Sequence, residues 1–147
     1  MHISARSDHA IRAALELACR EPEIVTAETI AAAQDVPRRS VVAILSDLRR
    51  ADLVRASRGS TGGYVLTRPA REITLGDVVR GVDGPAADVV GARADGAGCT
   101  DVTQHLPGVW AALRTSLRQV LDATTLHDVL TGDLPDHVRR LAEAPEV

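Results

Sequence analysis

The chain has 147 residues and a formal net charge of −3, a size that suits one ordinary domain or a small domain with an appended dimerisation arm. Its two cysteines are too few for a disulfide framework, and no stretch resembles a signal peptide. No apolar run approaches the ~20 residues of a membrane span, so we expect a cytoplasmic protein without a membrane partner.

Two helices are predicted in the first 36 residues. Ser4 is a suitable N-cap for a helix that runs to about Arg20, and Thr26 for a second, shorter helix after Pro22. In the first helix, apolar residues recur at helical spacing and form one stripe: Ile11, Ala14, Leu15, Ala18 and Cys19. This stripe predicts that Cys19 is packed in the core.

A third helix is predicted to start at Pro37, because a helix tolerates proline at its beginning. Its buried face is indicated by apolar residues at 3.6-residue spacing: Val41, Ile44, Leu45 and Leu48. The opposite face would be polar and could enter a DNA groove: Arg39, Ala43, Ser46, Asp47 and Arg50. This arrangement is typical of a recognition helix.

A glycine-rich hairpin follows this helix. The strands are predicted over Leu53–Ser57 and Tyr64–Leu66, with residues 58–63 as the tip. Three glycines in the tip permit a tight turn, which by itself would indicate an ordinary loop. Its position directly after an arginine-fronted helix favours a DNA-contacting wing.

The charge distribution supports that interpretation. The segment Arg38–Arg71 contains eight arginines and two acids and carries +6, so the remainder of the chain carries −9. Neutralisation of phosphates supplies much of the free energy of nucleic-acid binding, so a basic patch on an acidic protein indicates a DNA-docking face.

The second half of the chain predicts further helices. Thr74 and Thr125 each precede an aspartate by three residues, the pattern of a capping box that opens a helix. A long helix is predicted after Pro107, and we expect the polar segment beyond Leu130 to be frayed. The long helix has an apolar seam suited to pairing with a second subunit: Leu106, Trp110, Leu113, Leu117, Val120 and Thr124.

These elements divide the chain into four predicted parts. Residues 1–80 form a winged helix-turn-helix, and residues 81–107 form a long flexible loop of a sensor type. Residues 108–132 form the dimerisation region, and residues 133–147 a C-terminal tail. The fold class is therefore mainly α with a small β-wing, extended by a long C-terminal dimerisation helix.

Several motifs in this order resemble the winged-helix transcription regulators of the IscR/NsrR type, over nearly the whole length. They are Ser4-x-x-Ser7-Asp8-x-Ala10-Ile11-Arg12-Ala13, Leu48-Arg49-Arg50-Ala51-Asp52-Leu53-Val54, Arg58-Gly59-x-x-Gly62-Gly63-Tyr64-x-Leu66, Ile73-Thr74-Leu75-Gly76-Asp77-Val78-Val79-Arg80, Trp110 and Thr125-Leu126-x-Asp128. The resemblance implies a homodimer that exchanges contacts between its long helices. It also implies a recognition helix in the major groove, with Arg58 in the minor groove.

The chain departs from this family in its cysteines. Cluster-binding members resemble one another in having three cysteines in the loop before the tryptophan helix, whereas this chain has one, Cys99. Asp8 stands where nitric-oxide sensors of the family use an acid, so Asp8, His9, Cys99 and His105 form a conceivable mixed ligand set. Thiolates are the preferred ligands of iron–sulfur clusters, and this loop contains one cysteine. We therefore expect no cofactor. Cys99 is interpreted as an ordinary loop residue, a redox-reactive thiol or a ligand.

The sequence as a whole predicts a dimeric transcriptional regulator, a repressor that binds a palindromic operator in double-stranded DNA. Its signal would be redox-linked or a small molecule, and the effector is unknown. The predicted DNA contacts are Arg38, Arg39, Ser40, Arg49, Arg50, Arg55, Arg58 and Gly59. No catalytic triad, phosphate loop or carboxylate pair predicts an enzyme. The alternatives are a protein-interaction module, whose binding would depend little on salt, and a cluster-binding sensor.

Overall fold

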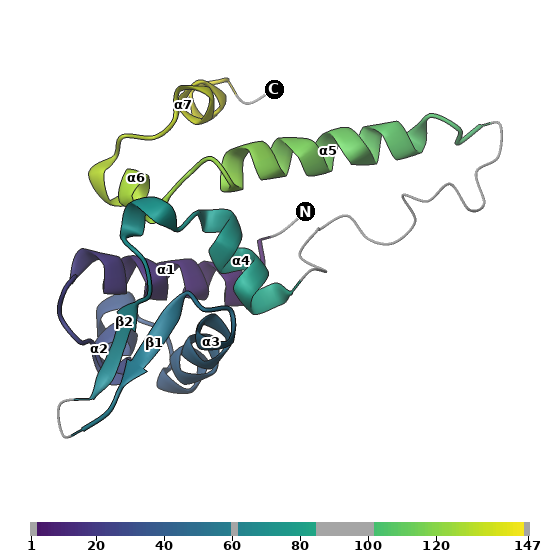
Figure 1. Cartoon of the computed structure of the whole chain (residues 1–147). Coiled ribbons are helices and arrows are strands. Elements are labelled where there is room, and N and C mark those ends of the chain that lie inside the picture. Colours follow the sequence, from purple (N-terminus) through teal and green to yellow (C-terminus); the bar gives the residue numbers. More distant parts are fainter. Residues whose placement is uncertain (1–2, 60–61, 85–101, 146–147) are drawn as a thin grey trace.

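The computed structural model describes residues 3–59, 62–84 and 102–145, and its elements follow one another along the chain as drawn in Figure 1. The helices and strands are α1 Ala5–Cys19, α2 Ala27–Gln34, α3 Arg38–Arg50, β1 Val54–Ser57, β2 Gly63–Leu66, the 3-10 turn η1 Ala70–Glu72, α4 Leu75–Asp83, α5 Leu106–Leu121, α6 Leu126–Thr131 and α7 Asp136–Ala142. The fold class predicted from the sequence is confirmed. No described helix combines the length and the apolar character needed to cross a membrane.

The first two helices begin at the predicted caps. The hydroxyl of Ser4 accepts a hydrogen bond from the Ser7 amide, and the hydroxyl of Thr26 accepts one from Thr29. The buried face of α1 is rotated from the predicted stripe and consists of Ser7, Ala10, Ala13, Ala14, Leu17 and Ala18.

The prediction that Cys19 is packed in the core is wrong, because its side chain is exposed. Leu17 and Ala18 are both buried, and each step along a helix turns by about 100°, so Cys19 lies about 200° around the helix from Leu17 and outside the buried face. Ile11 and Leu15, on the same edge, are half-buried.

A tight turn joins α2 to α3. Asp35 adopts the left-handed conformation with φ of 52°, and the amide of Val36 donates to the Ala31 carbonyl at 3.1 Å. Pro37 then occupies the N-cap of α3. All four residues predicted for the buried face of α3 lie in the core: Val41, Ile44, Leu45 and Leu48.

The hairpin after α3 is a two-stranded antiparallel sheet, with Val54 opposite Leu66 and Ser57 opposite Gly63. Val25, before α2, pairs with Tyr64 on the free edge of β2 through amide–carbonyl bonds of 2.8 and 3.0 Å. This third segment attaches the base of the wing to the helical body.

The two predicted capping boxes are confirmed, and the structure brings them together. Thr74 opens α4 and Thr125 opens α6, each with its aspartate partner. Their backbones form an antiparallel bridge, in which Leu75 donates to Thr124 and Leu126 to Ile73, both at 2.9 Å. Leu126 is fully buried, so the chain after α5 is anchored in the core.

The helix α5 extends over the body as a long arm (Figure 1), and none of its residues is buried in the single chain. It begins at Leu106, and α4 continues to Asp83, so both helices extend into the range predicted as a loop. Most of that loop, residues 85–101, lies outside the described residues.

The prediction of a frayed C-terminal segment is wrong over α7. Pro135 occupies the N-cap, Asp136 lies in the first turn, and Arg139 and Arg140 lie in the last turn. These charges have the signs that the helix dipole favours at each end, which stabilises a short helix.

Candidate nucleic-acid interface

The arginine-rich elements gather at one end of the molecule, where α3 and the β1–β2 hairpin lie together, away from α6 and α7 (Figure 1). Alternation along β1 places Val54 in the core and Arg55 in solvent. On α3, the residues opposite the buried face are exposed, among them Arg39, Ala43 and Ser46. Local periodicity thus determines the direction of these side chains, as the sequence predicted.

The arginines at the start of α3 differ in their partners. Arg38 donates to the carboxylate of Glu28 on α2 at 2.5 Å, and this hydrogen bond lowers the pKa of Glu28. Arg39 is exposed and has no acidic partner within the described part of the chain, and Ser40 is half-buried. DNA phosphates would therefore meet Arg39 directly, but would compete with Glu28 for Arg38.

Asp47 was expected on the polar reading face, and this prediction is wrong. Its side chain is buried against the body and accepts hydrogen bonds from Arg6 of α1 and from Arg50. Sequence reasoning missed Arg6, because it lies 41 residues from Asp47 and no local pattern connects the two. A carboxylate between two guanidinium groups is satisfied inside the protein and does not face a DNA groove.

The wing presents Arg55 and Arg58 as exposed side chains. Gly59 has φ of +120°, a conformation that side-chain-bearing residues rarely adopt, and Gly62 donates to its carbonyl at 3.0 Å. Residues 60 and 61 lie outside the described residues. In the ranges that the structure describes, Arg49, Arg55 and Arg58 have no acidic partner, so their charges are available to an external anion.

In the part of the chain that the structure describes, the ligand candidates named from the sequence are not gathered into one site. Asp8 forms an ion pair with Arg12 at 2.8 Å on one side of α1, and His105 is exposed at the start of α5. Cys99 lies outside the described residues. Among those that are described, no three His, Cys, Asp or Glu side chains are grouped so that they could hold a metal ion. His9, the fourth candidate, is half-buried on α1.

A helix-turn-helix followed by a β-hairpin, with unpaired arginines on both, defines a winged-helix DNA-binding protein. Residues 3–132 match the Rrf2 family, described as iron-dependent transcriptional regulators. The chain belongs to this family. It is therefore a DNA-binding transcriptional regulator and not an enzyme.

Individual relatives agree with this assignment. A protein of Mycobacterium tuberculosis assigned as an HTH-type transcriptional regulator is 44% identical over 144 residues, covering 97% of this chain and 89% of that protein. The structure of CymR, the global cysteine regulator of Bacillus subtilis, is similar with a TM-score of 0.74 and 29% identity, over 89% of this chain and 97% of that one. The structure of IscR from T. potens has a TM-score of 0.71 and 26% identity, over 100% and 94% of the two chains.

Proposed function

We propose that this protein is a homodimeric repressor that binds a palindromic operator. Arg38, Arg39 and Ser40 would enter the major groove at the start of α3, and Arg58 with Gly59 would enter the minor groove. Arg49, Arg50 and Arg55 would contact the phosphate backbone. The observation that carries this proposal is the gathering of exposed arginines on α3 and β1 at one end of an otherwise acidic molecule.

The dimer is proposed from the apolar residues of α5 that the single chain leaves uncovered. Thr124, the last residue of the predicted seam, lies beyond α5 and is buried in the chain itself. Leu106 is 43% exposed, Val109 58% and Trp110 36%, while Leu113 and Leu117 are half-buried. Such an apolar face is stabilised when a second copy covers it, and a two-fold operator matches a two-fold protein. We propose repression because a dimer bound across a promoter would exclude RNA polymerase. We also propose that the protein acts in the cytoplasm, since its partner is DNA.

The wing assignment is tested by Arg58→Ala. We expect a loss of about 1–3 kcal/mol in specific operator binding with an unchanged thermal midpoint, because an exposed guanidinium contributes to binding and not to folding. The measurement is a fluorescence-anisotropy titration with an operator selected from a random duplex pool. Arg140→Ala on α7 is the control, since it removes the same charge at the opposite end of the molecule (Figure 1). Equal affinities for the parent and Arg58→Ala would refute the wing contact.

For the signal, we propose a redox-linked or small-molecule effector, with the Cys99 thiol as the redox candidate. We expect hydrogen peroxide to weaken operator binding by the parent but not by Cys99→Ser. Cys19→Ser is the necessary control, because Cys19 is also exposed. Stoichiometric iron and acid-labile sulfide in anaerobically purified protein would contradict this proposal, whereas peroxide sensitivity that survives both substitutions would indicate another effector.

A further inference from the structure

The α5 arm meets the DNA-binding body at one junction, which we call the α4–α5 joint. It consists of two segments. Residues 73–80 include the first turns of α4, and residues 122–126 run from the end of α5 to the first residue of α6. The antiparallel bridge between Thr74 and Thr125 fixes the backbones of these segments against each other. The bridge alone leaves the direction of α5 undefined, because α5 ends at Leu121, before the bridged residues.

Arg80 connects the two sides of this joint. Its guanidinium donates to the carboxylate of Asp122 at 2.7 Å and to that of Asp77 at 3.1 Å. Asp122 is the C-cap of α5, where the helix dipole disfavours an acid. The Arg80 cation offsets that repulsion, and its hydrogen bond with Asp122 raises the pKa of Arg80.

Gly76 makes this contact possible. A Cβ atom at residue 76 would lie 1.9 Å from a carboxylate oxygen of Asp122 and 3.1 Å from the Arg80 guanidinium. Side-chain carbons do not approach another atom as closely as the first distance, and the second is tighter than most real contacts. A side chain at residue 76 would therefore displace the Asp122 carboxylate from this position.

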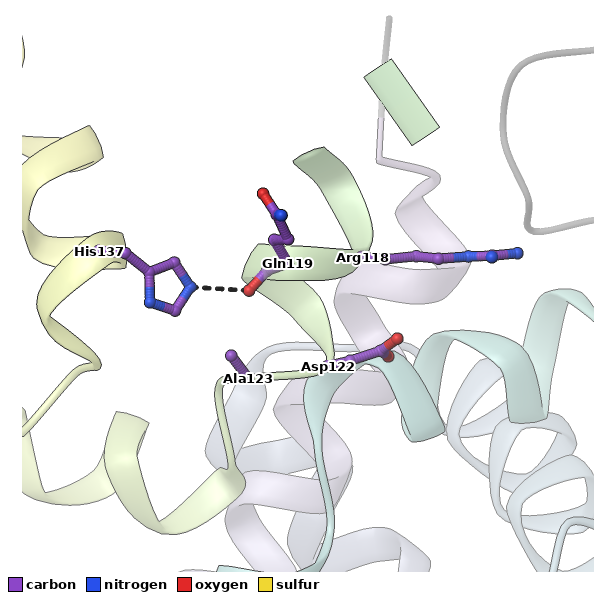
Figure 2. Close-up of a pocket in the computed structure, with 5 residues that line it drawn as sticks. All are labelled: Arg118, Gln119, Asp122, Ala123 and His137. Atoms are coloured by element: carbon purple, nitrogen blue, oxygen red, sulfur yellow. Dashed lines mark hydrogen bonds between the residues drawn. The ribbon is translucent and has the colours of Figure 1, made fainter. Parts of the chain in front are cut away.

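The opposite side of the same α5 turn is braced by α7. Figure 2 shows His137 directed at α5, where its Nε2 donates to the Gln119 carbonyl at 2.8 Å. The C-terminal end of α5 is thus held from two sides, by Arg80 and by His137. Toward its N-terminus, the arm presents the exposed Leu106, Val109 and Trp110.

From this geometry we propose that Arg80, together with Asp122, sets the angle of the α5 arm and thereby the spacing of operator half-sites that the dimer accepts. This inference rests on the proposed homodimer. If the two subunits join through α5, the angle between α5 and the body determines how far apart the two α3 helices lie. Arg80 is then a positioning residue for operator choice, although it lies outside the DNA-contacting face.

The lengths involved make a small change of angle measurable. An α-helix rises 1.5 Å per residue, so the 16 residues of α5 span about 24 Å. A tilt of roughly 10° at the joint would displace the far end by about 4 Å. One added base pair moves a half-site by about 3.4 Å and also rotates it by about 34°, so the displacement from such a tilt is comparable with the translation of one base pair.

The test uses the full-length protein and symmetric duplexes made from two copies of the half-site that the parent selects. The distance between the half-sites is varied one base pair at a time, and a duplex with a single half-site is included. We expect Arg80→Ala and Asp122→Ala to reduce the preference for the best spacing over its neighbours by about two- to fivefold, the range that an exposed ion pair supports. Affinity for the single half-site should not change.

Two further variants make the result specific to the contact. The double variant should lose no more spacing preference than either single variant, because both remove one interaction. Gly76→Ala, which displaces the Asp122 carboxylate without changing charge, should alter the spacing profile as well. Arg12→Ala is the matched control: it breaks an ion pair within α1, and its side chain is 51% exposed against 48% for Arg80.

The outcomes separate this inference from the proposed function. Sedimentation first establishes whether the parent is a dimer, and a monomeric parent would overturn the proposed dimer and this inference with it. Dimeric variants with the parent's spacing profile would overturn the inference alone, as would an equal loss for every spacing and for the single half-site. If Arg80→Ala does not fold, Asp122→Ala decides.

Discussion

The arginines of the basic segment differ because of their immediate neighbours. Arg38 and Arg50 are engaged by Glu28 and Asp47 in the free protein, whereas Arg39 has no such partner in the described residues. An engaged arginine must exchange a carboxylate for a phosphate when DNA binds, so its net contribution is smaller. Arginines of the same segment therefore differ in the free energy that they can contribute to DNA binding.

Glu28→Gln should strengthen DNA binding, because it removes the carboxylate that competes for Arg38. We expect an affinity gain of about two- to fivefold and a salt dependence steeper by up to about 0.9 in log–log slope. The measurement is a titration with operator DNA at several salt concentrations. Glu143→Gln, at the end of α7, makes the same charge change far from α3 and should have no such effect. Unchanged affinity in Glu28→Gln would show that Glu28 does not compete with DNA.

Gly63 is a residue at which a single methyl group should destabilise the fold. A Cβ atom there would lie 2.6 Å from the carbonyl oxygen of Val25, which the bridge to Tyr64 holds in place. Gly63→Ala should cost about 1–3 kcal/mol in the free energy of unfolding, measured by urea denaturation.

Gly108 provides the comparison, since a Cβ atom there meets nothing within 4 Å and the residue lies in α5. Gly108→Ala should leave stability unchanged or raise it, because alanine favours a helix over glycine by about 1 kcal/mol. Equal effects of the two substitutions would contradict the steric argument at Gly63.

At the scale of elements, the starts of α4 and α6 combine local capping with long-range pairing. Each threonine satisfies an amide of its own helix, while the two backbones bond to each other. A capping box therefore both begins a helix and fixes where that helix sits on the body. Loss of one cap should loosen both α4 and the segment after α5.

The capping aspartate of α4 gives this junction a pH dependence. Burial opposes the ionised form of Asp77, but hydrogen bonds from Thr74 and Arg80 outweigh it and lower the pKa of Asp77. A lowered pKa in the folded state stabilises the protein above the ordinary value of about 3.9, and that stabilisation is lost as the pH falls through the folded-state value.

Asp77→Asn lacks this ionisable group at every pH. Urea unfolding should therefore show a parent more stable than Asp77→Asn at pH 7, with the difference shrinking below about pH 4. A difference that stays constant from neutral to acidic pH would contradict the assignment to the Asp77 carboxylate.

At the scale of the whole molecule, charge and apolar surface are segregated. The +6 segment comprises α3, the wing and most of η1. The exposed apolar residues of α5 lie over the other side of the body (Figure 1). A surface that attracts DNA and a surface that attracts a second copy are thus separate, so one can be altered without the other.

Leu113→Glu tests this separation, because a charge in the seam opposes burial against a second subunit. We expect a monomer by sedimentation and weakened binding to the two-half-site operator, with the affinity for a single half-site retained. Thr115→Glu, exposed on the opposite side of α5, should remain dimeric. A dimeric Leu113→Glu would exclude this seam as the interface.

The starts of α1, α2, α3, α4 and α6, the buried face of α3, the hairpin and the class of protein could all be predicted from the sequence alone. Each of these depends on residues a few positions apart: a cap and its amide, an apolar repeat of 3.6, or glycines in a turn. Such signals depend little on the rest of the fold, because the interacting groups are neighbours in the chain. The family motifs are made of the same local patterns.

The burial of residues at the edge of a helix face, and the contacts between residues far apart in the chain, depend on the packing of the whole fold. Cys19 continues an apolar stripe of α1 but is exposed, because the rest of the fold packs against a neighbouring face of that helix. Asp47 with Arg6 and Asp122 with Arg80 are joined across 41 and 42 residues. A residue is buried only if another part of the chain packs against it, and the local periodicity of the sequence does not indicate which part that is.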